Sequence, residues 1–284
     1  MTRLASWQDY GTHDESAYPE LWSGCVGAWA PCLGPTGLRL HDLSVYHNWG
    51  TLTNMDAATD WVVSGGRYAL DFDEVNDYVS IGTNVPMAGQ FLTGSAWIRP
   101  PTSGECYALT QYNTNVSPQR NFYFGSAFFT ALGQSVIVVG TSTINYLAFT
   151  GPQLTVDTWT HVAFALFING ASSTCAIYHN GLPVTATDRS MGTRPTTYPT
   201  STSIPFGMSS GVKGNGSRFY SGGSLDDVRL YNRLLSPAEA RLLSVRRGIA
   251  YERQKRRSVF FDAAFFNPAW ARNSNVILSP VGAA

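Results

Sequence analysis

The sequence predicts an all-β protein built as a two-sheet antiparallel sandwich. Charged residues make up only 13% of the 284 residues, which argues against long solvated helices. Short runs rich in Val, Ile, Thr, Phe, Tyr or Trp recur between residues 21 and 231, and each ends at Gly, Asn, Asp, Ser or Pro. Two Asn-Gly pairs, Asn169-Gly170 and Asn180-Gly181, are typical of hairpin turns, because tight turns need positive φ.

The elements follow in order along the chain. Residues 1–20 are polar and aromatic without a clear period, and we expect an extended N-terminal arm. Residues 21–235 form the predicted sandwich. Its clearest strands are residues 24–29, 68–72, 78–81, 94–99, 135–139, 159–168, 174–178 and 226–231.

One helix is predicted after the last strand, over residues 236–248. Ser236 can cap it, Pro237 suits its first position, and Glu239 completes a capping box. Gly248 is placed to end it. Residues 249–284 then form a basic and aromatic C-terminal arm that the sandwich does not need for its own core.

Charge and hydropathy argue against nucleic-acid-binding and membrane proteins. The formal net charge is zero, so no global field draws the chain to nucleic acid or anionic lipid. No apolar run approaches the roughly 20 residues of a membrane-spanning helix. The first ten residues lack the apolar core of a signal peptide, so we expect synthesis in a cytoplasm.

Five segments carry a family resemblance. They are CVGAW at 25–29, HDLSVYHNWGTLTN at 41–54, ALDFDEVNDYV at 69–79, WTHVA at 159–163 and GSLDDVRLYNRLLSPAE at 223–239. Together they resemble the laminin-G-like, concanavalin-A-like family of jelly-roll domains. The resemblance implies a jelly roll in which the first strand, 24–29, pairs with the last, 226–231. Glu74 and Val45 stand where that family usually has a turn glycine and a loop glycine.

Oxygen-bearing side chains gather on the hairpin at 71–77 and at the start of strand 226–231. Ca²⁺ takes 6–8 oxygen ligands, and it is the one cofactor that the sequence suggests. The alternative is that these side chains cap the backbone N–H groups of their own turn. A two-residue period places one aspartate of 226–227 inward and the other outward. The candidate ligands are Asp73, Asn76, Asp77, Asp226 and Asp227.

Catalytic patterns are missing from the sequence. A glycoside hydrolase of this fold needs a carboxylate pair, usually carried on one strand as E-x-D-x-E, and that pattern does not occur. The P-loop and H-E-x-x-H motifs are absent as well. His161, within WTHVA, is interpreted as a packed core histidine. We therefore expect a protein that is not an enzyme.

The C-terminal arm is the main departure from a simple sandwich. Residues 241–257 hold seven basic residues and one acid, a local charge of +6. Basic and aromatic residues together could bind nucleic acid, but a protein partner is favoured, because the aromatic residues that follow are too apolar to stay solvated. The predicted docking residues are Arg246, Arg247, Arg253, Arg256, Arg257, Phe260, Phe261, Phe265, Phe266 and Trp270.

The sequence supports two alternative functions, and a glycoside hydrolase is a third, disfavoured one. Sandwiches with extended arms resemble proteins encoded by tailed bacteriophages, which predicts a virion component, a capsid decoration or fibre, that docks on other subunits and on its own copies. The alternative is a stand-alone lectin-like module that binds a surface glycan. Its predicted sugar contacts are Trp49, Tyr112, Tyr146 and Tyr198. No membrane association is expected.

Overall fold

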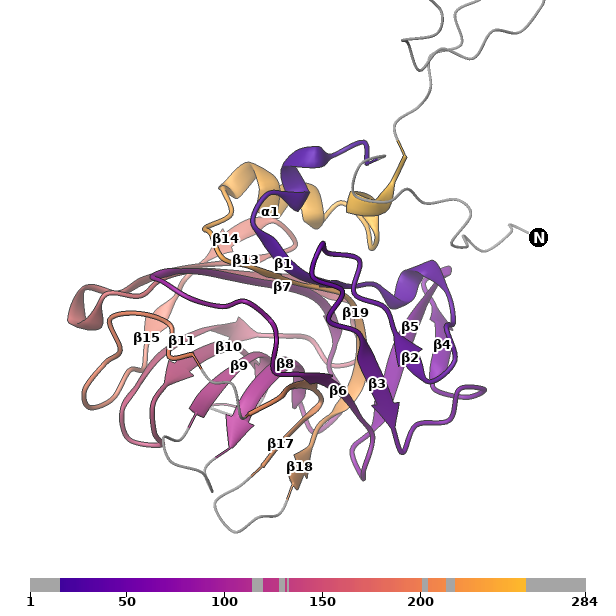
Figure 1. Ribbon diagram of the computed structural model, residues 1–284, viewed down its shortest axis with the longest axis horizontal. Coiled ribbons are helices and arrows are strands. Elements are labelled where there is room, and N and C mark those ends of the chain that lie inside the picture. The colour runs from indigo at the N-terminus through magenta and orange to yellow at the C-terminus, as the bar shows by residue number, and fades with distance from the viewer. Residues whose placement is uncertain are drawn as a thin grey trace, which may run out of the picture.

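The structure, a computed structural model, describes residues 16–113, 120–127, 131, 133–200, 204–212 and 218–253. Two β-sheets lie face to face, with the main core between them (Figure 1). This confirms the predicted all-β sandwich. Within the described residues, no helix is long and apolar enough to cross a membrane.

Eight strands of the described chain form the first sheet. Its order is β14 (Leu182–Val184), β13 (Thr174–His179), β12 (Thr160–Phe167), β7 (Phe91–Arg99), β19 (Gly222–Tyr231), β5 (Arg67–Asp73) and β4 (Trp61–Ser64), and β1 (Cys25–Trp29) pairs with β19. Strands β1 and β19 are antiparallel, with Cys25 opposite Tyr231 and Trp29 opposite Val228. The predicted pairing of first and last strands is confirmed.

The second sheet has eleven strands among the described residues. Its order is β15 (Thr187–Asp188), β11 (Tyr146–Gln153), β10 (Gln134–Gly140), β9 (Arg120–Ala127), β8 (Cys106–Asn113), β16 (Phe206–Met208), β6 (Tyr78–Gly82), β3 (Gly50–Thr53) and β2 (Arg39–Leu40). A short hairpin of β17 (Ser210–Val212) and β18 (Arg218–Tyr220) lies beside β8. The strands pair antiparallel except where β17 meets β8.

Side-chain alternation builds the core. In β12, Val162, Phe164 and Leu166 point inward and are fully buried. The Phe164 ring meets Phe124 from the second sheet, with ring centroids 6.1 Å apart. Gly94 in β7 lies beneath Phe124, and a Cβ there would come within 2.8 Å of that ring. The glycine thus permits the close approach of the two sheets.

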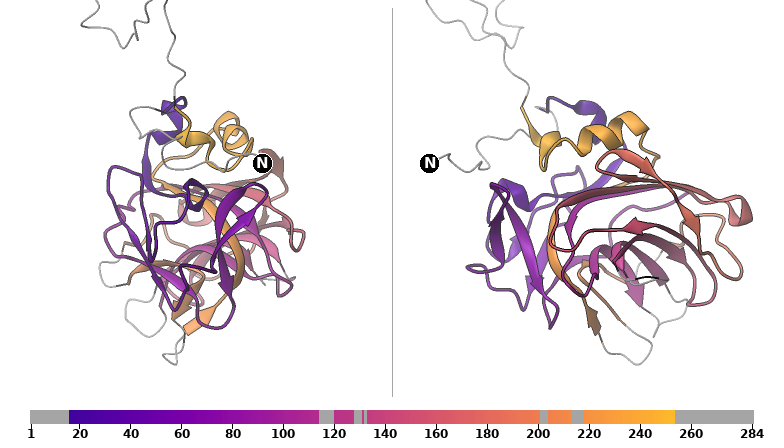
Figure 2. Two further views of the ribbon diagram at one scale, coloured as in Figure 1. Left: turned by 90° about the vertical axis from the view of Figure 1, so that its right-hand side faces the viewer. Right: turned by 180° about the vertical axis from the view of Figure 1, so that it is seen from behind.

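One α-helix, α1 (Pro237–Leu243), covers part of the outer face of the first sheet (Figure 2). Both hydrogen bonds of the predicted capping box form between Ser236 and Glu239. Ala240 packs on Ala163 and Ala165 of β12. The helix ends at Leu243, five residues short of the predicted end, and Gly248, with φ of 76°, leads into a 3-10 turn, η6 (Ile249–Tyr251).

A second apolar cluster joins the two ends of the described chain. Leu21 and Trp22 from η3 (Pro19–Trp22) pack with Ile249 and Tyr251 of η6. The Ser16 hydroxyl donates to the Ala250 carbonyl at 2.7 Å, and Ser16 bridges to Arg253. Residues 16–20 and 249–253 therefore belong to the folded unit. The predicted C-terminal arm does not begin at 249, because Ile249, Ala250 and Tyr251 are buried in this cluster, and at the other flank Ser16 and the partly buried Tyr18 contact it.

The remaining turns differ from one another. Asn180 and Gly181 have φ of 49° and 75° and form the predicted tight turn between β13 and β14. Asn169 has φ of −153°, and Gly170 begins a 3-10 turn, η5 (Gly170–Ser172), so a longer loop replaces the tight turn predicted there. A further 3-10 turn, η4 (Pro31–Leu33), follows β1.

Candidate functional site

Tyrosines gather on the outer face of the second sheet. In β6, Val79 and Ile81 enter the core, so Tyr78 and Ser80 point outward. The same alternation turns tyrosines outward from β8, β9 and β11. The outward tyrosines are Tyr78, Tyr107, Tyr112, Tyr123 and Tyr146. Whereas α1 covers part of the outer face of the first sheet, this face of the second presents aromatic rings.

Three of these tyrosines, Tyr107, Tyr112 and Tyr123, pack edge to face. The Tyr107 and Tyr123 ring centroids lie 5.4 Å apart at 84°, and those of Tyr112 and Tyr123 lie 6.2 Å apart at 64°. Small buried side chains, Val138 and Ala148, form the floor beneath them. Burial raises the pKa of Tyr112 above its ordinary value of 10.0, so its phenol stays protonated at neutral pH. A protonated phenol can both donate and accept hydrogen bonds.

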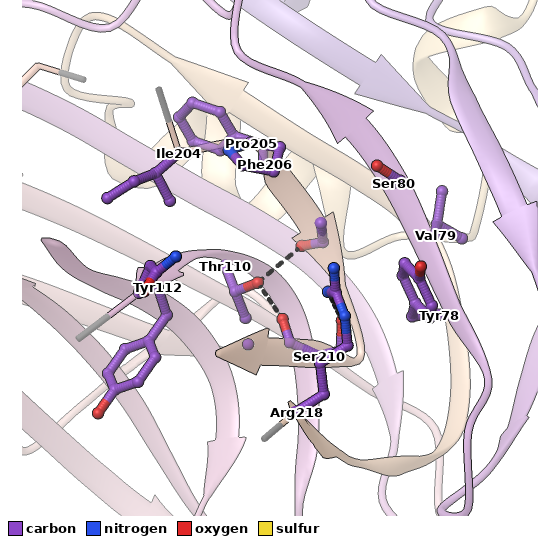
Figure 3. A pocket seen from close by; sticks show the side chains of 13 residues that line it. Tyr78, Val79, Ser80, Thr110, Tyr112, Ile204, Pro205, Phe206, Ser210 and Arg218 are labelled. Carbon is purple, nitrogen blue, oxygen red and sulfur yellow. Dashed lines mark hydrogen bonds between the residues drawn. The ribbon is translucent and has the colours of Figure 1, made fainter. Parts of the chain in front are cut away.

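A pocket of about 120 Å³ opens at one end of this face, where β6, β8, β16, β17 and β18 meet (Figure 3). The Thr110 hydroxyl fixes its base, because it is within hydrogen-bonding distance of the carbonyl oxygens of Gly207, at 3.2 Å, and Ser210, at 2.5 Å. These contacts fasten the short strands β16 and β17 to β8. A Cβ at Gly207 would lie 2.9 Å from the Val79 carbonyl oxygen, so the glycine allows that close packing.

Arg218 lies at the pocket beside Tyr78. Its guanidinium carbon is 4.5 Å from the centroid of the Tyr78 ring, and its Nη1 donates to Ser210 Oγ at 3.5 Å. Tyr220 flanks Tyr78, with centroids 6.2 Å apart. Among the described residues that line the pocket, none is Asp, Glu or His. The lining combines aromatic rings, hydroxyls and one cation.

The predicted metal ligands on the 71–77 hairpin cap their own turn. Asp73 Oδ1 accepts the backbone N–H groups of Val75, Asn76 and Asp77 at 2.8, 3.1 and 3.3 Å. Asp77 Oδ2 in turn accepts the Asp73 N–H at 3.2 Å. This is the turn-capping arrangement that the sequence left open as the alternative to calcium.

The other two predicted ligands lie in a different environment. Asp226 and Asp227 are both buried, at 0% and 2% exposure, and both contact the segment after α1, through Arg247 and the Gly248 N–H, so the predicted alternation of one inward and one outward aspartate is wrong. A bulge in β19, with Asp227 at φ of 44°, breaks the two-residue period. Asp226 Oδ1 accepts the Cys32 N–H at 2.8 Å, and Asp227 Oδ1 pairs with Arg229 Nε at 2.8 Å.

The five predicted ligands therefore do not form one calcium site. Across the part of the chain that the structure describes, no three side chains of His, Cys, Asp or Glu are grouped to hold a metal ion. Calcium at the hairpin alone, through Asp73, Asn76 and Asp77, stays a prediction.

The predicted sugar contacts fall into three environments. Tyr112 lines the pocket, and Tyr146 lies on the same face. Trp49 is 42% exposed on the loop before β3, stacked on His41 at 5.2 Å and contacted by Arg39. Tyr198 is only 4% exposed and donates to Gln111 Oε1 at 2.9 Å. Its prediction as a ring contact is wrong, because the ring is part of the core.

Sequence reasoning missed Tyr78, Ser80 and Arg218. The alternation Tyr78-Val79-Ser80-Ile81 shows which two side chains point outward and could have identified them. Arg218 gave no comparable signal, since β18 has three residues.

Two of the predicted docking arginines are bound within the chain. Arg247 is 6% exposed, its Nε lies 3.5 Å from Asp226 Oδ2, and its guanidinium stacks 4.3 Å above Trp159. The prediction that Arg247 binds another chain is wrong. Arg246 pairs with Glu252 at 2.5 Å.

The other predicted docking residues lie at or beyond the end of the described chain. Arg253 is its last residue, bridged to Ser16. Arg256, Arg257, Phe260, Phe261, Phe265, Phe266 and Trp270 lie outside the described residues.

His161 is the buried histidine that the sequence predicts. It is 1% exposed, and its Nε2 lies 2.9 Å from Ser95 Oγ. Burial lowers its pKa to about 4, which keeps the imidazole neutral at physiological pH. A packed structural role for His161 is confirmed.

A comparison with protein-family models shows the family of this chain. A laminin-G-type family model, described as the concanavalin A-like lectin/glucanases superfamily, matches residues 73–241. The chain belongs to this superfamily. The match spans the tyrosine face, the pocket and the Asp226–Asp227 pair of this superfamily member. A search of curated proteins found no match to the sequence.

Solved structures share the fold at low sequence identity. Domain 4 of AbnA, a GH43 extracellular arabinanase from Geobacillus stearothermophilus, in complex with arabinotriose, has a TM-score of 0.54 and 15% identity; the match covers 78% of this chain and 98% of that domain. Botulinum neurotoxin type C, whose cell entry is described as dependent on two ganglioside molecules, has a TM-score of 0.51 and 11% identity over 80% of this chain. The chain spans about half of that toxin chain, 52%.

Proposed function

We propose that the protein is a non-catalytic carbohydrate-binding module that holds its glycan on the outer face of the second sheet. The observation that carries the proposal is the pocket between Tyr78, Tyr112 and Arg218, where aromatic rings and hydrogen-bonding groups open on one surface. A sugar ring has an apolar C–H face and a rim of hydroxyls. An aromatic ring complements the face, and convergent polar groups complement the rim.

Two fold relatives support a glycan as the ligand. The arabinanase domain was solved with arabinotriose, and the neurotoxin's entry is linked to gangliosides. Both names concern carbohydrate-bearing molecules, and both proteins share the sandwich of this chain.

The pocket lining supports binding without hydrolysis. Glycoside hydrolases of the common type flank the scissile bond with two carboxylates, and the described lining of this pocket contains none. Acidic residues of the 71–74 hairpin line a separate hollow of about 290 Å³. There Asp71 accepts from Ser224 Oγ at 2.6 Å, and Asp157 lies 3.5 Å from Arg99. Hydrolysis is therefore the less favoured activity.

Substitution of the pocket rings tests the proposal. We expect Tyr78→Ala and Tyr112→Ala each to weaken binding to a cognate oligosaccharide about 10-fold or more, as measured by calorimetry after a glycan-array screen, because each removes ring contact. Tyr46→Ala is the matched control, since Tyr46 is 47% exposed and lies outside the pocket. Full binding by the two pocket variants, or no array signal from the parent chain, would contradict the proposal.

We further propose that this module is carried on a virion, as a capsid decoration or fibre subunit of a tailed bacteriophage. The support is the sequence of the C-terminal arm, whose basic and aromatic docking residues beyond Arg253 lie outside the described residues. A glycan-binding face on one side of a sandwich and a docking arm on the chain end suit a displayed subunit that recognises a cell surface.

A further inference from the structure

We infer that the pocket selects acidic glycans and that Arg218 binds their anionic group, a carboxylate or a sulfate. The inference rests on the proposed function, because it names the class of sugar that the same pocket would hold. Its basis is a guanidinium group placed among hydroxyls and rings, with no carboxylate partner among the described residues.

Arg218 differs from the arginines that are ion-paired within the described chain. Within the described residues, six arginines lie within 4.0 Å of a carboxylate oxygen. They are Arg99, Arg194, Arg229, Arg233, Arg246 and Arg247. Arg218 is exposed, and among the described residues its guanidinium group contacts the Tyr78 ring and the Ser210 hydroxyl. Its positive charge is therefore not neutralised within the described chain.

The stacking partner fixes how the guanidinium group is presented. The guanidinium carbon of Arg218 lies 4.5 Å from the centroid of the Tyr78 ring, which is a cation–π contact. Its one hydrogen bond, to Ser210 Oγ, is long at 3.5 Å. The other N–H donors form a planar fork, which matches two oxygens of a carboxylate or sulfate.

The rest of the pocket admits an anion without repulsion. The described lining contains no Asp or Glu, so an entering carboxylate meets no like charge. Ser80 and the phenols of Tyr78 and Tyr112 are neutral groups that suit sugar hydroxyls. In Figure 3 the Arg218 side chain lies between Tyr78 and Ser210, on the wall formed by β6, β17 and β18.

The test compares matched neutral and acidic oligosaccharides on the full chain. The probes are a neutral hexose oligomer, the corresponding uronate oligomer and a sulfated oligomer, each measured by calorimetry. We expect the parent chain to bind at least one acidic probe about 10-fold or more tightly than the neutral one, and added salt to reduce that preference. The acidic probe that binds identifies the anionic group as carboxylate or sulfate.

Variants assign the preference to Arg218. Arg218→Gln should abolish it, and Arg218→Lys should retain part of it, because lysine keeps the charge but not the fork. Arg241→Gln on α1 removes the same charge from an exposed site outside the pocket and should leave the preference intact. Circular dichroism and melting curves check that the variants fold.

Three outcomes would overturn the inference. Equal affinity of the parent chain for neutral and acidic probes would refute acidic selectivity while leaving glycan binding in place. A preference that survives in Arg218→Gln would assign it to another residue. No binding to any probe would count against this inference and the proposed function together.

Discussion

Two adjacent aspartates hold the C-terminal segment onto the sandwich. Asp226 pairs with Arg247, while Asp227 Oδ2 accepts the Gly248 N–H at 3.0 Å. Burial raises the pKa of Asp226 to about 7, although the Arg247 charge opposes the rise. Both ends of this pair are buried, so removing one partner leaves a charge without compensation.

We expect Arg247→Ala to lower the free energy of unfolding by about 3–5 kcal/mol, because it leaves the buried Asp226 carboxyl without its cationic partner. Urea denaturation measures the loss. Arg247→Ala with Asp226→Asn should recover part of it, since the second change removes the unpaired charge. Arg241→Ala, on the exposed face of α1, should stay within about 0.5 kcal/mol of the parent. A loss for Arg247→Ala no larger than for this control would contradict the buried pair.

Asp77 gives the hairpin a dependence on pH. Burial first, then the charges of Asp73 and Asp60, raise its pKa from 3.8 to about 6. The folded state therefore binds the proton of Asp77 more tightly than the unfolded state does. This proton contributes its whole stabilisation of the fold below about pH 4, and the contribution is lost as pH rises through about 6. Asp77→Asn should therefore raise the melting temperature relative to the parent chain at pH 7, and by more at pH 7 than at pH 4.

The same melting curves test calcium at the hairpin. Calcium that binds only the folded state would raise the melting temperature of the parent chain, and Asp77→Asn would abolish that rise. Identical curves with calcium and with EDTA would leave the turn hydrogen bonds of Asp73 as the whole role of these acids. A difference in melting temperature between the parent chain and Asp77→Asn that is the same at pH 4 and at pH 6 would contradict the raised pKa of Asp77.

At the scale of elements, the sequence predicted what depends on local pattern. The capping box at Ser236 follows from one local motif, whereas the pairing of β1 with β19 was implied by the family resemblance. The bulge at Asp226 and Asp227 could not be predicted in this way, because the alternation of side chains assumes an unbroken two-residue period. The burial of Arg247 could not be predicted either, because basic residues in a run are ordinarily solvated. Arg247 is covered through its tertiary contacts with Asp226 and Trp159.

The pocket was beyond sequence reasoning for a related reason. Its walls include β16, β17 and β18, strands of three residues each, which are too short to show a period. Tyr112 was identified as an aromatic candidate, but its neighbours come from β6 and β18, distant in sequence. Proximity across strands is set by sheet order, which the chain does not reveal locally.

The turn η6 completes the second apolar cluster, and truncation tests this. Tyr251 contacts the Trp22 ring at 5.4 Å and lies 4.5 Å from the Arg229 guanidinium carbon. We expect a chain ending at Gly248 to lose about 3–6 kcal/mol by shedding Ile249 and Tyr251, each worth about 1.5–3 kcal/mol. A chain ending at Arg253 should keep the parent melting temperature. Equal stability of the two would contradict a structural role for η6.

At the scale of the whole molecule, the two outer faces differ. The chain covers part of the first sheet with α1 and the cluster around Trp22 and Tyr251. The second sheet presents tyrosines and the pocket. The described chain leaves the sandwich at Arg253, next to η6 and on the side of the first sheet (Figure 1). An arm that continues from there would start away from the pocket, so docking and glycan binding can be separated.

Truncation of the arm tests this separation. The arm beyond Arg253 carries five large aromatic residues, four phenylalanines and Trp270, and each ring contributes about 1.5–3 kcal/mol when buried. We expect the full chain to assemble with its own copies or a particle, and a chain ending at Arg253 to be monomeric by light scattering yet to bind oligosaccharide with unchanged affinity. Its fold is the control, because the cut leaves Ile249 and Tyr251 in place. Assembly that survives the cut would show that the arm is not the docking element, and lost glycan binding would show that the two functions share one surface.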